Sequence, residues 1–254
     1  IDKNTINFVN ENNDTILEYM AQRKNIIFCK TDYLHFFYYN ILPKLKTQFI
    51  LITHNSDLNS GFNNSLIKHP LLIKWYGQNM ISYNIKVEGI PIGLENKYFK
   101  TTNYKHILNN SKNNKEKLLY INFSTKTNNE RKKILFNMVN NGFKINDKKK
   151  WEEYIKDLSQ YKFCLCPYGN GIDTHRIWEA LYLKVIPIVI YSRVFEFFKG
   201  LPILFIDDFC KIKPNILEEI YNNQIKNKKL NFDKLDIEYW KREIQNQINL
   251  DFTL

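Results

Sequence analysis

The sequence has few cysteines, few glycines and no long apolar run. The lack of long apolar runs argues against a membrane-spanning protein, and the few cysteines argue against a cysteine-rich metal site. Only four Cys and eight Gly occur in 254 residues. No stretch approaches the roughly 18 consecutive apolar residues that a membrane-spanning helix needs, and no basic and apolar leader opens the chain. We therefore expect a cytoplasmic protein without a transmembrane segment. The hydrophobic content of 44% indicates a folded chain that buries a sizeable core.

The cysteines do not form a metal motif. Cys164 and Cys166 alternate in the apolar run YKFCLC, which places both on one face of a strand. Because no Cys or His pair lies at ligand spacing, we interpret them as small buried residues and expect neither a bound metal nor a cofactor. Asn-x-Ser/Thr sequons, which arise by chance in so Asn-rich a chain, occur at Asn13, Asn63, Asn109 and Asn122.

Arginine is also scarce, with 32 Lys against 5 Arg. The net charge of +11 suggests an anionic partner, but the lysines form scattered clusters such as KINDKKKW, without a basic helix. Nucleic-acid binding rests on charge alone, and we expect none. Enrichment in Lys, Asn and Ile is typical of AT-rich coding, as in a giant virus, a protist or a low-GC bacterium. The rare arginines are therefore more informative than the lysines.

Strand-like and helix-like segments alternate twice along the chain, on either side of a polar stretch at residues 100–117. This alternation predicts βαβ units and an α/β fold of two Rossmann-like lobes with parallel sheets and a cleft between them. We expect residues 1–112 to form the first lobe and residues 113–254 the second, with 100–117 as linker. The final helix is expected to pack back on the first lobe.

One segment, PYGNGIDTHRIWE at residues 167–179, concentrates the polar chemistry. It follows the predicted strand YKFCLC and begins a helix near Asp173 or Thr174, both of which are good N-caps. Ligands of parallel sheets bind where strands end and helices begin, and a helix N-terminus binds phosphate. His175 and Arg176 occupy the first turn of this helix, where a cation opposes the helix dipole unless an anion is bound.

The remaining side chains of this segment complete a candidate diphosphate site. Arg176 offers a planar fork that binds a diphosphate with two bonds. Glu179 shares the helix face of His175 and Arg176, where a carboxylate can accept bonds from ribose hydroxyls. The alternatives are an ordinary Arg–Glu surface pair and, for Asp173, a simple N-cap. Trp178 is expected to anchor the helix to the sheet.

Three other phosphate or nucleotide motifs are absent. GNGIDT matches only part of the GxGxxG pattern, and no acidic residue closes the next strand as NAD binding requires. No Gly-Lys-Ser/Thr follows, as a Walker loop would need. The nearest approach to an Asp-x-Asp metal motif is Asp207 and Asp208, which we interpret as a turn that ends a strand.

The segment YKFCLCPYGNGIDTHRIWEALYLKVIPIVI resembles the nucleotide-sugar-binding segment of exostosin-like glycosyltransferases, which have the GT-B fold. YINFSTKTNNERKKIL looks like the first strand and helix of that family's C-terminal lobe, and Arg131 matches an arginine that helps hold the donor diphosphate. The first half, with ILITHNSD, resembles N-terminal lobes of viral and microbial sugar transferases. Lys184 departs from the pattern, since relatives often have Gly there.

This resemblance implies transfer of a UDP- or GDP-linked sugar to a glycan or protein hydroxyl, without a metal. The donor would be bound by Arg131, Tyr168, Gly169, Asn170, Gly171, Asp173, Thr174, His175, Arg176 and Glu179, with Tyr168 available to stack on the base or sugar. For the general base we favour Asp57, with His54 and then Glu95 as further candidates. An Asx-turn role for Asp57, a retaining mechanism and a non-catalytic sugar-nucleotide or glycan-binding module remain open.

Overall fold

The computed structural model describes residues 5–8, 25–95 and 103–250. Contacts divide the chain into two compact units. The first contains the residues up to Ile92, Arg193–Phe198 and those from Ile237 onward, and the second contains Gly93–Ser192 and Lys199–Asp236. The predicted boundary at residue 112 differs from this division, because 93–112 group with the second unit.

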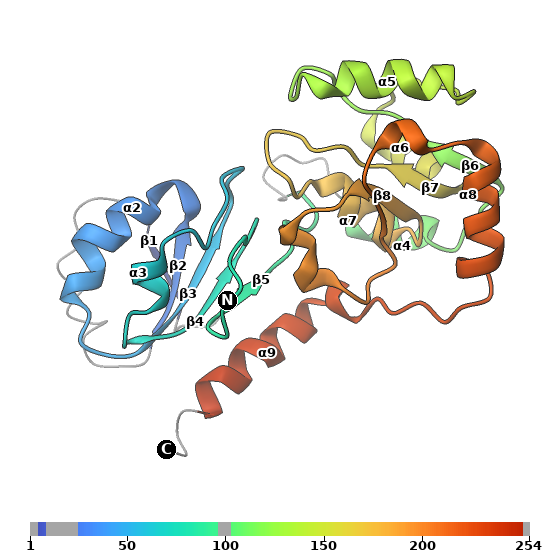
Figure 1. Cartoon of the computed structure of the whole chain (residues 1–254). Helices are drawn as coiled ribbons and strands as arrows, with labels where there is room; N and C mark the ends of the chain where they lie inside the picture. Colours follow the sequence, from blue (N-terminus) through green and yellow to red (C-terminus); the bar gives the residue numbers. More distant parts are fainter. Residues whose placement is uncertain (1–4, 9–24, 96–102, 251–254) are drawn as a thin grey trace. The chain divides into compact units, whose positions relative to one another are not determined.

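The first unit contains a parallel sheet in the order β1-β2-β3-β4-β5 (Figure 1). Buried Phe37, Phe49 and Trp75 form part of its core, and Asn63 caps α3 by accepting a bond from the Leu66 N–H. Its described elements are β1 (Thr5–Phe8), β2 (Asn25–Lys30), α2 (Leu34–Phe36), β3 (Phe49–His54), α3 (Asn64–Ile67), β4 (Leu72–Gly77), β5 (Val87–Gly89) and α9 (Ile237–Leu250).

The second unit contains a parallel sheet in the order β6-β7-β8-β9. Because all four strands are parallel, their carboxyl ends meet at one edge, where ligands of such sheets bind. Its described elements are α4 (Tyr104–Asn110), β6 (Lys117–Tyr120), α5 (Glu130–Asn140), α6 (Trp151–Leu158), β7 (Tyr161–Leu165), α7 (His175–Tyr182), β8 (Ile186–Ile190), β9 (Leu204–Ile206) and α8 (Pro214–Ile220).

Both faces of the second sheet are covered. Phe163 and Leu165 of β7 pack in one core cluster with Met138 of α5 and Leu217 of α8. Side chains alternate along a strand, so Cys164 between them faces the other side. Cys164 and Cys166 are both buried free thiols.

The predicted α/β architecture with parallel sheets is confirmed, but one local prediction is wrong. The segment 100–117, predicted to be a linker, contains α4, whose Ile107 is fully buried. Strand order follows chain order in both sheets, so the described strands lack the reversal of order found in a Rossmann sheet.

Lys184 has a backbone conformation that favours glycine. It follows the C-cap of α7 with a φ of 57°, in the left-handed region where glycine is favoured. The helix ends there all the same, because the Lys184 and Val185 N–H groups donate to the Leu181 and Ala180 carbonyls.

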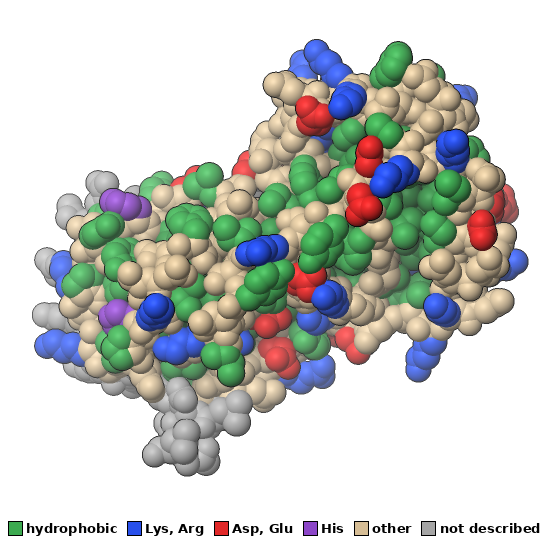
Figure 2. Space-filling model, in the orientation of Figure 1, with side chains coloured by type: hydrophobic (Ala, Val, Ile, Leu, Met, Phe, Trp, Pro, Cys, Tyr) green, Lys and Arg blue, Asp and Glu red, His purple; other side chains and the backbone are tan. Residues whose placement is uncertain are grey.

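Two features bear on partners. No helix in the described part of the chain has both the length and the apolar character to cross a membrane. On the face of the molecule that Figure 2 presents, Lys and Arg side chains are scattered among Asp and Glu rather than gathered in one patch.

Candidate functional site

The loop at residues 167–174 lies at the carboxyl end of β7 and leads into α7. The Gly169 N–H donates to the Gly171 carbonyl at 3.0 Å, which closes a tight turn. Thr174 is the N-cap of α7. The segment that the sequence singles out is therefore a short turn between a buried strand and a helix N-terminus, and Asn170 at its tip is exposed.

Arg131 holds this loop from α5. Its guanidinium donates to the carbonyls of Tyr168, Pro167 and Ser124 and to the Thr127 hydroxyl, at 2.7 to 2.9 Å. No ion pair joins this buried arginine to a carboxylate within the described residues. Burial and the nearby charge of Arg176 lower the pKa of Arg131.

One N–H of Arg131 has no acceptor in the described chain. A guanidinium has five N–H donors, and four hydrogen bonds are made, one of them from Nη2. A Cβ on Gly169 would lie 3.3 Å from this Nη2 and 3.5 Å from Thr174 Cγ2. Glycine therefore keeps the loop backbone close to Arg131 and Thr174.

Thr174 carries a second unsatisfied donor. Its Oγ1 is buried and has no hydrogen-bond partner, and it makes no capping bond to α7. Leaving a buried hydroxyl unpaired costs about 1–3 kcal/mol. An anion with acceptor oxygens placed at this N-cap would satisfy it.

Arg176 and His175, in the first turn of α7, are partly buried. Arg176 donates from Nη1 to the Asn122 carbonyl, and its guanidinium lies 5.7 Å from the centre of the Tyr154 ring. Its other N–H groups form no hydrogen bond within the described residues. His175 Nδ1 donates to the Gly93 carbonyl at 2.8 Å, which leaves Nε2 facing no described partner.

Glu179 and Asp173 are engaged within the unit. The Glu179 carboxylate is 8% exposed and accepts bonds from Trp151 Nε1 and Tyr154 Oη, at 3.2 and 2.7 Å. Burial and this carboxylate raise the pKa of Tyr154. Asp173 Oδ1 accepts from Trp178 Nε1 at 2.7 Å. Because both carboxylates are also buried, little of either is accessible to a ribose hydroxyl.

Tyr168 is anchored at both ends. Its carbonyl accepts from Arg131, and its hydroxyl donates to the Ile190 carbonyl at 2.8 Å. Burial raises the pKa of this phenol to about 12. The ring is therefore held in place between the loop and the end of β8.

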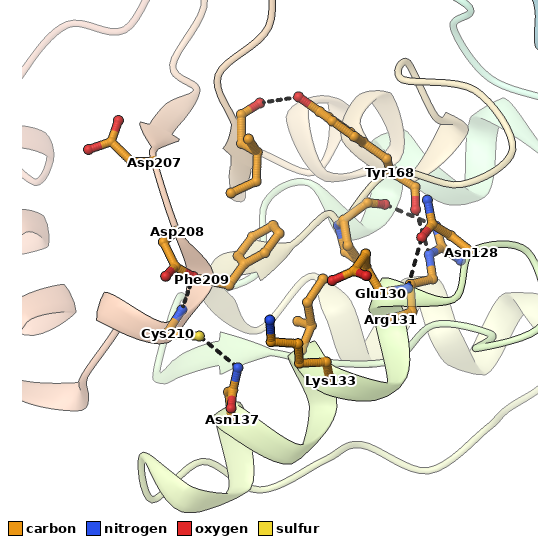
Figure 3. A pocket seen from close by; sticks show the side chains of 13 residues that line it. Asn128, Glu130, Arg131, Lys133, Asn137, Tyr168, Asp207, Asp208, Phe209 and Cys210 are labelled. Carbon is orange, nitrogen blue, oxygen red and sulfur yellow. Dashed lines mark hydrogen bonds between the residues drawn. The ribbon is translucent and has the colours of Figure 1, made fainter.

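Tyr168 forms one wall of a pocket of about 240 Å³ at the carboxyl ends of β7, β8 and β9. Figure 3 shows residues of α5 on one side and the strand ends on the other. The lining is apolar at Ile134, Pro167, Ile190 and Phe209, and polar or charged at Asn128, Glu130, Arg131, Lys133, Asn137, Asp207, Asp208 and Cys210. Asp208 caps the turn after β9, as the sequence predicts.

Within the described residues, no group of three or more His, Cys, Asp and Glu side chains could hold a metal ion. The expectation of metal-independent chemistry stays a prediction.

The three candidates for the general base differ in their surroundings. Asp57 follows β3, is exposed and makes no described hydrogen bond or ion pair. The side-chain turn at this corner is made by Ser56, whose Oγ accepts from the Leu58 N–H. His54 uses both ring nitrogens, toward Asn55 Oδ1 and the Pro91 carbonyl, and Glu95 belongs to the second unit.

Further polar groups, which the sequence did not single out, lie at the carboxyl ends of β2 and β4. Asp32 pairs with Lys30 at 3.3 Å. Although partial burial opposes the effect, hydrogen bonds from Ser56, its own backbone and Lys30 lower the pKa of Asp32. Thr31 Oγ1 and Gln78 Oε1 are buried without partners. Their polar character, directly after apolar strands, was the available signal.

No protein-family model matches the chain, and the comparison with curated proteins gives no match either.

Proposed function

We propose that the protein is a glycosyltransferase that moves a sugar from a nucleoside diphosphate to a hydroxyl group of an acceptor. One observation carries the proposal: Arg131, Thr174 and Arg176, at a single strand-to-helix loop, each have a donor without a partner among the described residues. Neither arginine forms an ion pair within the described residues, although the Glu179 carboxylate is near enough to offset part of the Arg176 charge.

A departing nucleoside diphosphate matches this arrangement. As the glycosidic bond breaks, negative charge builds on the diphosphate, and fixed donors that face this charge lower the barrier. The Arg176 fork, the Thr174 hydroxyl and the N-terminus of α7 are donors of this kind. The proposed chemistry needs no metal, because arginines and backbone N–H groups neutralise the leaving group.

The acceptor hydroxyl also needs a base if the reaction inverts the sugar. Asp57 is the best candidate, because its carboxylate is exposed and forms no ion pair within the described residues, whereas both ring nitrogens of His54 are already bonded. A carboxylate within reach of the acceptor hydroxyl would take up its proton in the transition state.

The test is release of nucleoside diphosphate from a panel of UDP- and GDP-linked sugars, measured with the wild type and with Arg176→Lys. The lysine keeps the charge but loses the fork, so we expect turnover to fall by about 100-fold, the loss typical of one oxyanion donor. Arg242→Lys, at an exposed site on α9, is the matched control and should be unaffected.

Two results would overturn the transferase proposal. Nucleotide binding without turnover of any donor would favour the non-catalytic binding module. Absence of both binding and turnover would exclude a nucleotide-dependent function at this loop.

A further inference from the structure

In addition to Arg131, the pocket beside the loop has two charged side chains on α5, Glu130 and Lys133. Glu130 is the first residue of α5 and Lys133 lies one turn further along the same helix. Both are exposed and both line the pocket. The Glu130 backbone N–H donates to Asn128 Oδ1 at 3.0 Å, but the side chains of Glu130 and Lys133 form no ion pair or hydrogen bond with each other or with another described residue.

The rest of the pocket suits a flat apolar ring. Figure 3 shows Glu130 and Lys133 on α5, with Phe209 and Tyr168 coming from the strand ends. The Tyr168 ring is fixed by its hydroxyl bond to Ile190, and Ile134 and Pro167 add apolar surface. A pocket with apolar walls and a few convergent polar groups is typical of small-molecule sites.

We infer that this pocket binds the nucleoside part of the donor and that the Glu130 carboxylate accepts hydrogen bonds from the ribose 2′- and 3′-hydroxyls. The inference rests on the proposed function. Glu130 and Arg131 both line the pocket, and Arg131 also donates to the Tyr168 and Pro167 carbonyls of the loop proposed to bind the diphosphate. The sugar next to the phosphates would therefore lie beside Glu130.

Glu130 replaces Glu179 as the expected ribose contact. The sequence predicts Glu179 for this contact, but both oxygens of Glu179 already accept hydrogen bonds, from Trp151 and Tyr154. An ionised carboxylate accepts hydrogen bonds through about four lone-pair sites on its two oxygens, but the buried Glu179 presents little of them to a ligand. The vicinal hydroxyls of ribose offer two donors side by side, and Glu130 has both oxygens available.

The experiment is calorimetric titration of the full chain with UDP, GDP and their 2′-deoxy counterparts. For the nucleotide that binds, we expect the ribo form to bind about 10-fold more tightly than the deoxy form, since a hydrogen bond to a charged group contributes about 1.5–3 kcal/mol. In Glu130→Gln the affinity for the ribo form should fall by about 10-fold. The ratio of ribo to deoxy affinity should then fall to about 1–2.

Glu153→Gln, an equal charge change at an exposed site on α6 outside the pocket, should leave both affinities and the ratio unchanged. Glu130→Ala, checked for folding by circular dichroism, should repeat the effect of the Gln variant. If both Glu130 variants keep the wild-type ratio of ribo to deoxy affinity, the ribose contact is wrong. It is also wrong if the wild type binds nucleotides without preferring the ribo form. A wild type that binds no nucleotide refutes the proposed function itself.

Discussion

At the scale of a single residue, a substitution at Thr174 can distinguish a ligand-binding role of its hydroxyl from a structural role. Its hydroxyl is buried but forms no hydrogen bond, so Thr174→Val removes an unsatisfied group while keeping the shape of the side chain. We expect the free energy of unfolding without ligand to stay within about 1 kcal/mol of the wild type or to rise.

Nucleoside diphosphate affinity of Thr174→Val should fall by about 10-fold if the hydroxyl contacts a phosphate. Chemical denaturation and calorimetry measure the two quantities on one sample. A clear loss of stability with unchanged affinity would show that the hydroxyl serves the fold instead.

Glu179 should show the opposite behaviour. Its buried carboxylate accepts bonds from Trp151 and Tyr154 beside the Arg176 charge. Glu179→Gln removes the negative charge and leaves that arginine less well compensated, which costs about 1–3 kcal/mol of unfolding free energy. The ratio of affinities for the ribo and deoxy nucleotides should not change. A stable variant with a lost ratio would restore the predicted ribose role of Glu179.

The sequence predicts some local features of the candidate site but not its tertiary contacts. The helix start at Thr174 and the crowding of His175 and Arg176 near it follow from local spacing. The partners of Glu179 do not, because Trp151 and Tyr154 come from α6 and meet α7 only through tertiary packing. The four acceptors of Arg131 were hidden for the same reason, since two of them belong to the loop after β7.

At the scale of elements, Lys115 links the ends of two helices. Its Nζ donates to the carbonyls of Ser159 and Leu183, the C-caps of α6 and α7. Burial and the charge of Lys184 lower the pKa of Lys115 to about 8. This folded-state value lies below the usual pKa of about 10.4 for the unfolded chain.

The lowered pKa predicts how stability depends on pH. Between about pH 8 and 10 the unfolded state binds more protons at Lys115 than the folded state, so this residue makes stability rise with pH in that window. Below pH 8 both states are protonated and the penalty is constant. The rise should be absent in Lys115→Met.

Urea denaturation of the wild type and Lys115→Met at several values from pH 7 to 10 measures the difference. A difference between the two that does not change with pH would contradict the lowered pKa.

Elements with strong apolar runs were predictable and those defined by single contacts were not. Runs such as FILITH and IPIVI form β3 and β8, because such strands are buried on both faces. α4 escaped prediction because Ile107 alone is fully buried in a polar segment. Lys184 shows the reverse case, where a helix ends in the left-handed region without the glycine that signals it.

At the scale of the whole molecule, the division into two units predicts that a substitution in the first unit can lower its stability without changing nucleotide affinity. All residues of the proposed donor site belong to the second unit, whereas α9, which carries the buried Trp240, belongs to the first. Trp240→Ala should lower the stability of the first unit by about 3–5 kcal/mol. Nucleoside diphosphate affinity should stay within about twofold.

Differential scanning calorimetry with and without nucleotide tests this separation. Nucleotide should raise the unfolding temperature of the second unit equally in the wild type and in Trp240→Ala. A variant that folds but loses nucleotide affinity would show that the donor site depends on the first unit.

The central claim is that the loop at 167–174 binds a diphosphate, and calorimetric titration of the wild type tests it most directly. Nucleoside, nucleoside monophosphate and nucleoside diphosphate of the same base are compared, for uracil and for guanine. The account predicts one site per chain and, for at least one base, affinity that rises about 10-fold or more from monophosphate to diphosphate. Equal affinity for all three forms, or no binding of any, would contradict it.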